Sequence, residues 1–287
     1  MTSADVDPPL EPLLPIYTAE LFPGLHAELI ALLRGLDEDD WARPTVAGAW
    51  RVRDVAAHLL DGDLRRLSAG RDAHLLPPDG PLDSFADVVG LINRANASGV
   101  AYAQRLSPRI ITDLLEVTGR WVADHFAQLP PHGDALYPVA WAGEERSENW
   151  MDIGREYTER WHHQMQIRDA VDARHALLEW DWLQPLLHFS VRALPRAFAN
   201  VDAPEGTAIT FHVQDTDSFT VVRTASGWRV FHGFAHYAAA LLRVGRDTAW
   251  RLLYNALPPE VARRELEFVE GDRALAEPLF RARSVMV

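Results

Sequence analysis

Residues 155–166 read REYTERWHHQMQ, a stretch typical of a long helix with two chemically different faces. Glu159 and His163 are four residues apart, so in a helix they project from the same face about one turn apart. A carboxylate oxygen and an imidazole nitrogen at this spacing can bind one cation. The stretch therefore predicts a helix that carries a candidate metal site.

The polar residues of this helix fall on a narrow stripe when positions are counted at about 100° per residue. The stripe contains Asp152, Glu156, Glu159, His163 and Gln166. Trp150, Ile153, Tyr157 and Trp161 lie on the opposite side, which is expected to be buried. Such a stripe is also typical of a solvent-exposed face without any site. His162, three residues after Glu159, lies slightly off the stripe and is a competing ligand.

The sequence around this helix predicts further helices, followed by a short region of strands. The helix itself is expected to have Ser147 as its N-cap and to end near Asp172. The earlier helices are expected at Thr18–Leu36, Val52–Gly70, Ser84–Leu106 and Pro108–Leu129, the last with Ser107 as its N-cap. After residue 173 the pattern predicts a helix at Trp182–Phe198, strands at Thr207–Val213, Ser218–Val222 and Trp228–Phe231, and helices at Ala235–Leu242, Thr248–Leu257 and Arg273–Arg283.

This order of elements predicts an α+β fold that is mostly helical. An all-helical domain is expected at residues 1–175, and a small α+β domain at residues 176–287. The length of 287 residues is consistent with two domains.

Composition excludes several kinds of chemistry. The chain contains no cysteine, so disulfides, thiolate metal ligands and a cysteine nucleophile are excluded. All 28 basic residues are arginine, which excludes catalysis by a lysine Schiff base. The net charge of −13 argues against a nucleic-acid partner. No signal peptide and no apolar run of the ~18–20 residues that cross a bilayer is present, so a cytoplasmic protein is expected.

A third ligand for the predicted site could come from the helix that begins near Val52. His58 lies there beside Val55 and Leu59, on the edge of the face that should be buried. A single histidine in such a position is more often a hydrogen-bonded structural residue than a ligand. The residues in line with His58 on this helix form a second polar stripe: Arg51, Asp54, Gly62 and Arg65. The two polar stripes could face water or a shared cleft, and their spacing does not decide between these.

Two parts of the chain resemble a known family. Residues 36–41 (LDEDDW), Pro44-Thr45 and residues 50–59 (WRVRDVAAHL) resemble the N-terminal domain of mycothiol-dependent maleylpyruvate isomerases, part of the DinB-like superfamily of metal-binding four-helix bundles. Residues 159–163 (ERWHH) match the second signature of that domain. The resemblance implies that His58, Glu159 and His163 are the three metal ligands. Gln166 stands where the family often has an aspartate.

The C-terminal part is similar to the small α+β domain of the same enzymes, which is related to sterol-carrier-like folds. The similar residues are 246–251 (RDTAWR), 269–276 (VEGDRALA) and 284–286 (SVM). Together the resemblances imply an N-terminal DinB-like four-helix bundle followed by a sterol-carrier-like domain.

A site of two histidines and one glutamate suits zinc, although other divalent ions are compatible with the same ligands. An external thiol is required for thiol chemistry, and the resemblance implies mycothiol. In the related isomerases the thiolate is thought to add to a cis double bond, allow rotation and leave. Such a substrate carries carboxylates, for which arginines are natural partners. Arg94 and Arg155 are the candidates for this role.

The sequence thus predicts a zinc-dependent enzyme that activates a small thiol for isomerisation or S-transfer on a small carboxylate. The alternatives are a hydrolase that uses zinc-bound water, and a non-catalytic module that binds a small ligand. The expected partner is a small molecule, with neither nucleic acid nor membrane, and the protein is expected to be a monomer or homodimer. His232 and His236, four residues apart, are interpreted as structural.

Overall fold

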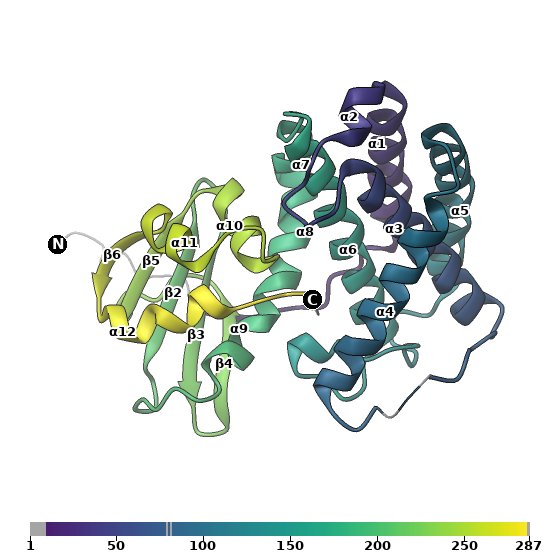
Figure 1. Ribbon diagram of the computed structural model, residues 1–287. Helices are drawn as coiled ribbons and strands as arrows, with labels where there is room; N and C mark the ends of the chain where they lie inside the picture. The colour runs from purple at the N-terminus through teal and green to yellow at the C-terminus, as the bar shows by residue number, and fades with distance from the viewer. Residues whose placement is uncertain (1–9, 79, 81, 286–287) are drawn as a thin grey trace. The chain divides into compact units, whose positions relative to one another are not determined.

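The computed structural model describes residues 10–78, 80 and 82–285, and its fold is α+β, as predicted (Figure 1). The chain divides into two compact units, and neither is a single continuous stretch. The helical unit comprises Tyr17–Tyr137 and Arg146–Leu177. The sheet unit comprises Pro138–Glu145, Leu178–Val285 and the segment up to Ile16.

The helical unit contains every helix that was predicted before residue 173. Its elements are η1 (Ala19–Leu21), α1 (Phe22–Gly35), α2 (Glu38–Ala42), α3 (Val52–Arg66), a π-helical turn η2 (Leu67–Arg71), α4 (Phe85–Ala103), α5 (Pro108–Gln128), α6 (Asn149–Ala170) and, at its end, α7 (His175–Leu178). The predicted cap Ser107 accepts a hydrogen bond from the backbone N–H of Ile110. A local sequence signal therefore sets the start of α5. At α6 the N-cap is Glu148, without a capping hydrogen bond from its side chain, and the expected cap Ser147 lies one residue earlier.

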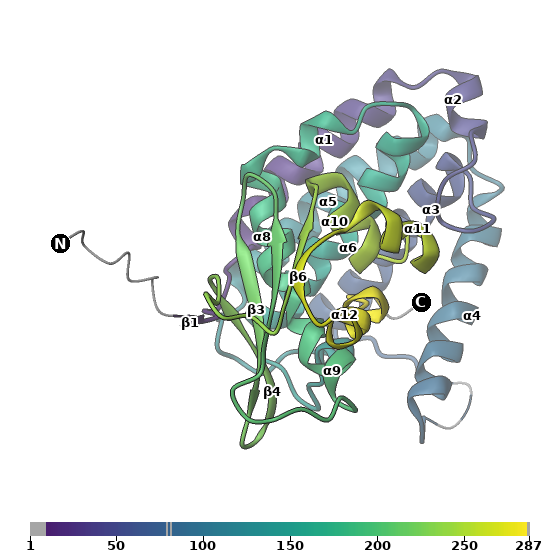
Figure 2. The same ribbon diagram turned by 90° about the vertical axis from the view of Figure 1, so that its left-hand side faces the viewer.

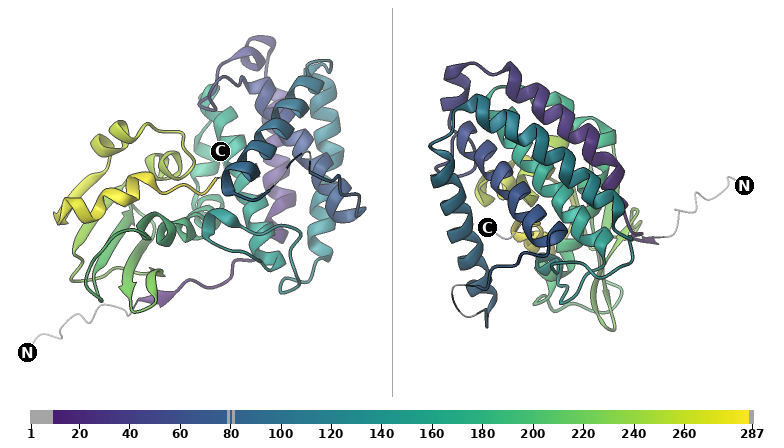
Figure 3. Two further views of the ribbon diagram at one scale, coloured as in Figure 1. Left: turned by 60° about the horizontal axis from the view of Figure 1, so that its bottom comes forward. Right: turned by 90° about the vertical axis from the view of Figure 1, so that its right-hand side faces the viewer.

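The long helices of this unit pack around a common apolar core. Helices α1 and α3 each pack against both α5 and α6, and α4 packs against α3. Figure 3 (right) shows α1 in purple beside α5 in blue. The core residues Leu29, Val55 and Leu115 are fully buried, one from each of α1, α3 and α5. Of the apolar side predicted for α6, Ile153, Tyr157 and Trp161 are buried, the last two at 0% exposure, whereas Trp150 in the first turn is only partly buried.

A buried charged network connects three helices beside this core. Arg160 on α6 forms an ion pair with Asp63 on α3 and donates a hydrogen bond to Nδ1 of His26 on α1, at 3.1 Å. Thr118 donates to the second oxygen of Asp63 at 2.9 Å. Gly119 allows the His26 ring to fit, because an added Cβ at this position would overlap the atoms of that ring. The charges are thus satisfied inside the unit, as buried charges must be.

We expect His26 to make the protein less stable in acid. Burial, and then the charge of Arg160, lower the pKa of His26 from 6.5 to about 4. The unfolded chain therefore takes up a proton that the folded chain refuses between pH 6.5 and 4, and the free energy of unfolding falls as the pH falls through this window. The loss should be on the order of 3 kcal/mol by pH 4. Urea unfolding at pH 7 and pH 4.5 measures it, and a His26→Gln variant should lose less between the two pH values. An equal loss in both proteins would contradict this role of His26.

The sheet unit contains one mixed sheet of six strands (Figures 1 and 2). The strands are β1 (Glu11–Pro12), β2 (Ala208–Val213), β3 (Ser218–Thr224), β4 (Gly227–His232), β5 (Ala240–Val244) and β6 (Glu267–Gly271), in the order β1-β4-β3-β2-β5-β6. Only β2 and β5 pair in parallel among these strands. The other elements are η3 (Ala140–Ala142), α8 (Trp180–Ser190), η4 (Val191–Ala193), α9 (Leu194–Phe198), α10 (Arg246–Leu253), α11 (Pro259–Glu265), α12 (Arg273–Ala276) and η5 (Glu277–Arg281).

The helix predicted at Ala235–Leu242 is wrong. The chain turns there and then forms β5, which pairs with β2 on one side and β6 on the other. Ala240, Leu241 and Leu242 are all buried, so both faces of the strand are covered and no alternation of polar and apolar residues remains. A short apolar run of this kind cannot be distinguished from a buried helix by its periodicity.

Other expectations for this unit need smaller corrections. The predicted helix at Trp182–Phe198 is broken into α8, η4 and α9, and that at Arg273–Arg283 shortens to α12 followed by η5. Strands β1 and β6 were not predicted. No helix among the described residues has the length and apolar character that a membrane crossing requires. A cytoplasmic location stays a prediction.

Candidate metal centre

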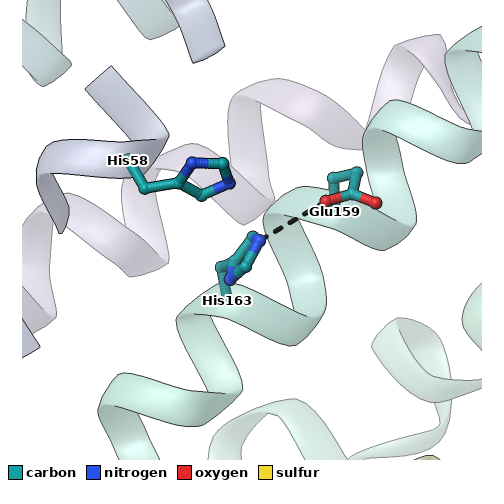
Figure 4. Close-up of side chains that lie close together, drawn as sticks. All are labelled: His58, Glu159 and His163. Carbon is teal, nitrogen blue, oxygen red and sulfur yellow. Dashed lines mark ion pairs between the residues drawn. The ribbon is translucent and has the colours of Figure 1, made fainter. Parts of the chain in front are cut away.

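Helices α3 and α6 bring His58, Glu159 and His163 together (Figure 4). One ligand atom from each side chain lies within 4.8 Å of those from the other two. His58 points from α3 toward the pair on α6, whose members are one helical turn apart. The pair on α6 was predicted from its spacing, His58 was named as a possible third ligand from its place on the earlier helix, and the resemblance implied all three.

The orientation of His163 suits a metal ligand. Its Nδ1 lies 2.8 Å from the Oε1 atom of Gln166, and a carbonyl oxygen requires that nitrogen to donate. In the neutral ring the lone pair is then on Nε2, which lies 3.4 Å from Oε2 of Glu159. A lone pair facing an ionised carboxylate is repulsive unless a cation lies between them. Gln166 therefore holds His163 in the tautomer that binds a metal.

His58 is not the hydrogen-bonded structural residue that the sequence also allowed. Its Nδ1 is buried and has no hydrogen-bond partner in the part of the chain that the structure describes. The ring lies between two others, with centroids 5.0 Å from Trp50 and 4.5 Å from His163. Burial, and next the electrostatic influence of the His163 ring, lower the pKa of His58 well below 6.5. The ring is therefore neutral at pH 7 and available as a ligand.

Glu159 is the negative member of the group. Burial alone would raise its pKa, but His162 and His163 outweigh burial and hold the pKa of this carboxyl below its usual value. His162 itself is neutral, since burial and His163 lower its pKa to about 3. Its Nδ1 donates to the Thr158 carbonyl at 2.8 Å, and it is not a member of the group, although the sequence made it a competing ligand. Glu159 therefore supplies the negative charge of the group, beside the neutral ring of His58.

The polar stripe of α6 is not a solvent-exposed face. Asp152, His163 and Gln166 are 3%, 8% and 5% exposed. Asp152 forms a bidentate pair with Arg66 of α3, at 2.8 and 3.1 Å. Because α3 supplies both this arginine and His58, the polar stripe of α6 faces α3 inside the helical unit. On α3 itself only His58 of the predicted stripe joins the metal group, since Arg51 and Arg65 are exposed.

The two candidate arginines for substrate binding occupy different environments. Arg94 is exposed on α4 and does not belong to the metal group. Arg155 lies one turn before Glu159, and its guanidinium is 2.5 Å from Asp152 and 3.0 Å from Glu156. Arg66 pairs with the same two carboxylates, so these four side chains balance one another in charge. A substrate carboxylate at Arg155 would have to compete with both acidic residues.

The donor set fits a divalent ion such as zinc. Two histidines and one glutamate form a three-ligand set that leaves a further position for water or substrate. The Glu159 side chain is 31% exposed, so the group is accessible from one side. Trp50 packs its ring against His58 and was not predicted as a site residue. Its place at the start of residues 50–59, which resemble the family, was the signal that could have identified it.

Removing the amide that orients His163 should weaken metal binding. We expect Gln166→Ala to lower zinc affinity by about 10–100-fold, the usual effect of losing a partner behind a metal-bound histidine. Competition with a chromophoric chelator measures the affinity. Gln166→Glu keeps an acceptor and should retain binding, and Gln128→Ala, at an exposed position on α5, serves as the control. An unchanged affinity in Gln166→Ala would show that the contact does not support the site.

Comparison with known proteins assigns the region that contains these residues to one sequence family. Residues 22–168, just over half of the 287, match the model of the mycothiol maleylpyruvate isomerase N-terminal domain. The crystal structure of the mycothiol-dependent maleylpyruvate isomerase is similar, with 12% identity, a TM-score of 0.51, and coverage of 82% of this chain and 86% of that chain. A mutant of that enzyme gives 14% identity, a TM-score of 0.47 and the same coverage. No curated protein sequence matches.

Proposed function

The chain belongs to the family of the mycothiol maleylpyruvate isomerase N-terminal domain, and on this premise we propose that it is a divalent-metal-dependent enzyme that activates an external thiol. The proposed reaction is isomerisation of, or S-transfer to, a small carboxylate substrate. The observation that carries the proposal is the convergence of His58, Glu159 and His163, with Nε2 of His163 3.4 Å from Oε2 of Glu159.

We propose that these three residues hold zinc. When bound, such an ion supplies Lewis acidity that lowers the pKa of a thiol or water in its open position. The residues of the chain do the remaining work. Gln166 fixes the ring of His163, His58 binds as a neutral imidazole, and the negative charge of Glu159 favours a divalent over a monovalent ion. Trp50 covers one side of His58 and limits access of water.

The thiol must come from outside, because the chain has no cysteine. We propose mycothiol, the thiol that the family name specifies. In the isomerisation the sulfur adds to one carbon of a cis double bond, the resulting single bond rotates, and the thiol leaves. No atom is gained or lost overall. Arg155 and Arg94 stay proposals for binding the substrate carboxylates. Arg155 lies one turn from Glu159 on α6, whereas Arg94 lies on α4.

We also propose the finer fold assignments that the resemblance implied. The ring formed by α1, α5, α3 and α6 supports a DinB-like four-helix bundle. The short helices that accompany a mixed sheet support a sterol-carrier-like second domain. Whether the protein is a monomer or a homodimer stays a prediction.

The test is turnover of maleylpyruvate by the zinc-loaded full chain, with and without mycothiol, followed by ultraviolet absorbance. We expect turnover only with the thiol, and a loss of at least about 100-fold in His163→Ala, since removing a ligand should cost no less than removing its supporting residue. His132→Ala, which changes an exposed histidine of the same unit, should behave as wild type. Mass spectrometry of the products detects S-transfer to the same substrate.

Two other outcomes correspond to the other interpretations of the sequence. Hydrolysis of small esters or amides by the zinc-loaded chain without any thiol would replace the proposal by a hydrolase that uses the same three ligands. Absence of bound zinc, with no turnover under any condition, would favour a module that only binds a small ligand.

A further inference from the structure

A second group of two histidines and one carboxylate lies in the sheet unit. Nε2 of His188 is 2.5 Å from one oxygen of Asp217, and Nε2 of His232 is 3.1 Å from the other. One ligand atom from each residue lies within 4.8 Å of those from the other two. Like the first centre, this group has two histidines and one carboxylate, which here belongs to an aspartate. It shares no residue with that centre.

The register of the sheet brings these residues together. His232, the last residue of β4, pairs with Phe219 of β3, so both side chains lie on the same face of the sheet. Helix α8 covers this position, since the His188 ring is 5.1 Å from the rings of both Phe219 and His232. Asp217 ends the turn between β2 and β3, and its carbonyl accepts a hydrogen bond from the Val213 amide. Each of the three residues therefore has a fixed backbone.

The surroundings of the group are apolar on one side and open on the other. Phe219 is fully buried beside it, as are Phe211 and Val221 along the same face. The side chains of His188, Asp217 and His232 are 19%, 20% and 36% exposed, so solvent reaches the group. The apolar side lowers the local dielectric constant, which strengthens the interaction of these side chains with an ion. The open side lets an ion reach them.

We propose that His188, Asp217 and His232 form a second site for a divalent transition-metal ion of the zinc class. The two nitrogens and the carboxylate match the ligand types that zinc prefers, and solvent access leaves room for water as a further ligand. Burial lowers the pKa of His188, and the hydrogen bond to Asp217 raises it by less, so this pKa stays below 6.5. Burial raises the pKa of Asp217, but the hydrogen bonds to His188 and His232 outweigh burial, so this pKa lies below its usual value. At pH 7 the group thus combines a neutral imidazole at His188 with an ionised carboxylate.

Ion binding would exchange hydrogen bonds for coordination bonds. Ligand atoms around a tetrahedral zinc ion are roughly 3.3 Å apart, given bond lengths near 2.0–2.1 Å. The separation of 2.5 Å between His188 and Asp217 must therefore widen, whereas the 3.1 Å separation at His232 changes little. Each imidazole then binds through Nε2 and carries its proton on Nδ1. The competing role is a hydrogen-bonded cluster that only stabilises the fold, and the number of bound ions distinguishes the two.

The experiment is equilibrium dialysis of the full chain against zinc, followed by elemental analysis. We expect two zinc ions per wild-type chain, one in His163→Ala, one in His232→Ala, and none in the double variant. His236→Ala is the matched control, because it removes an exposed histidine from the segment that follows β4. Asp217→Asn is a second variant that keeps the size of the side chain and should also lose one ion. Circular dichroism verifies that each variant is folded.

Cobalt gives an independent readout, since each occupied site adds visible absorption bands. His163→Ala should retain one set of bands, and the further change His232→Ala should remove it. One zinc ion in the wild type and none in His163→Ala would overturn the second site and leave the first intact. One ion in the wild type that is lost only in His232→Ala would support the second site and overturn the first. The two proposals therefore fail independently.

Discussion

Replacing Glu159 by glutamine is expected to remove one equivalent of bound zinc and the thiol-dependent activity together. The change keeps the size of the side chain but removes the only negative charge among His58, Glu159 and His163. It also replaces an ionised oxygen, whose pKa is held low by His162 and His163, with a neutral amide that is a much weaker zinc ligand. We expect zinc affinity to fall by more than about 100-fold, beyond the range for a supporting residue.

The measurement is a chelator competition titration of the wild type and Glu159→Gln, with turnover assayed on the same samples. Glu148→Gln is the matched control, because Glu148 is an exposed carboxylate that directly precedes α6. The control should bind zinc and turn over substrate as the wild type does. Retention of wild-type zinc content by Glu159→Gln would remove Glu159 from the ligand set.

Replacing Asp63 by alanine is expected to lower the free energy of unfolding by about 3–5 kcal/mol, the usual effect of removing one partner of a buried ion pair. Asp63 and Arg160 are each 4% exposed, and Asp63 also accepts from Thr118. Without the carboxylate, the Arg160 guanidinium stays inside the helical unit with its charge uncompensated. The cost is therefore the burial of a lone charge, in addition to the loss of a contact.

Urea unfolding of Asp63→Ala measures this loss. Asp113→Ala is the control, since Asp113 pairs with Arg34 at 3.2 Å and both side chains are about half exposed. That change should cost less than about 1 kcal/mol. A double variant, Asp63→Leu with Arg160→Met, should recover part of the stability by removing both charges, although His26 then loses its donor. A loss below about 1 kcal/mol in Asp63→Ala would show that the pair is not a main contributor.

The sequence predicted the helices of the first unit because each carries its own signals. Ser107 caps α5, and the four-residue spacing of Glu159 and His163 is enough to place both on one face of α6. His58 differs, because no spacing rule links a residue on α3 to α6, so the sequence left a ligand and a structural role open and the resemblance implied the ligand. Whether the polar stripe of α6 faced solvent was also undecided, because the answer depends on Arg66 from another helix.

The sheet unit was harder to predict because its structure depends on pairing between distant segments. Ala240–Val244 is a strand because β2 and β6 lie on its two sides, and nothing within the segment itself excludes a helix. His188, Asp217 and His232 have no common spacing, so only the sheet register and the position of α8 reveal their proximity. The domain boundary after residue 175 stays a prediction.

The pairing of β1 with β4 has a consequence for how the protein folds during synthesis. Pro12 is opposite Phe231 in this pair, so β1 must stay unpaired during synthesis until β4, which lies much later in the chain, has been made. The helices of the helical unit are complete by Leu178, whereas the sheet unit cannot close until β4 has been made. Contacts between such distant segments form slowly, because closing a long loop costs entropy before the contact can stabilise it. We therefore expect the helical unit to become protected from proteases on the ribosome first, and the segment at Glu11–Pro12 last.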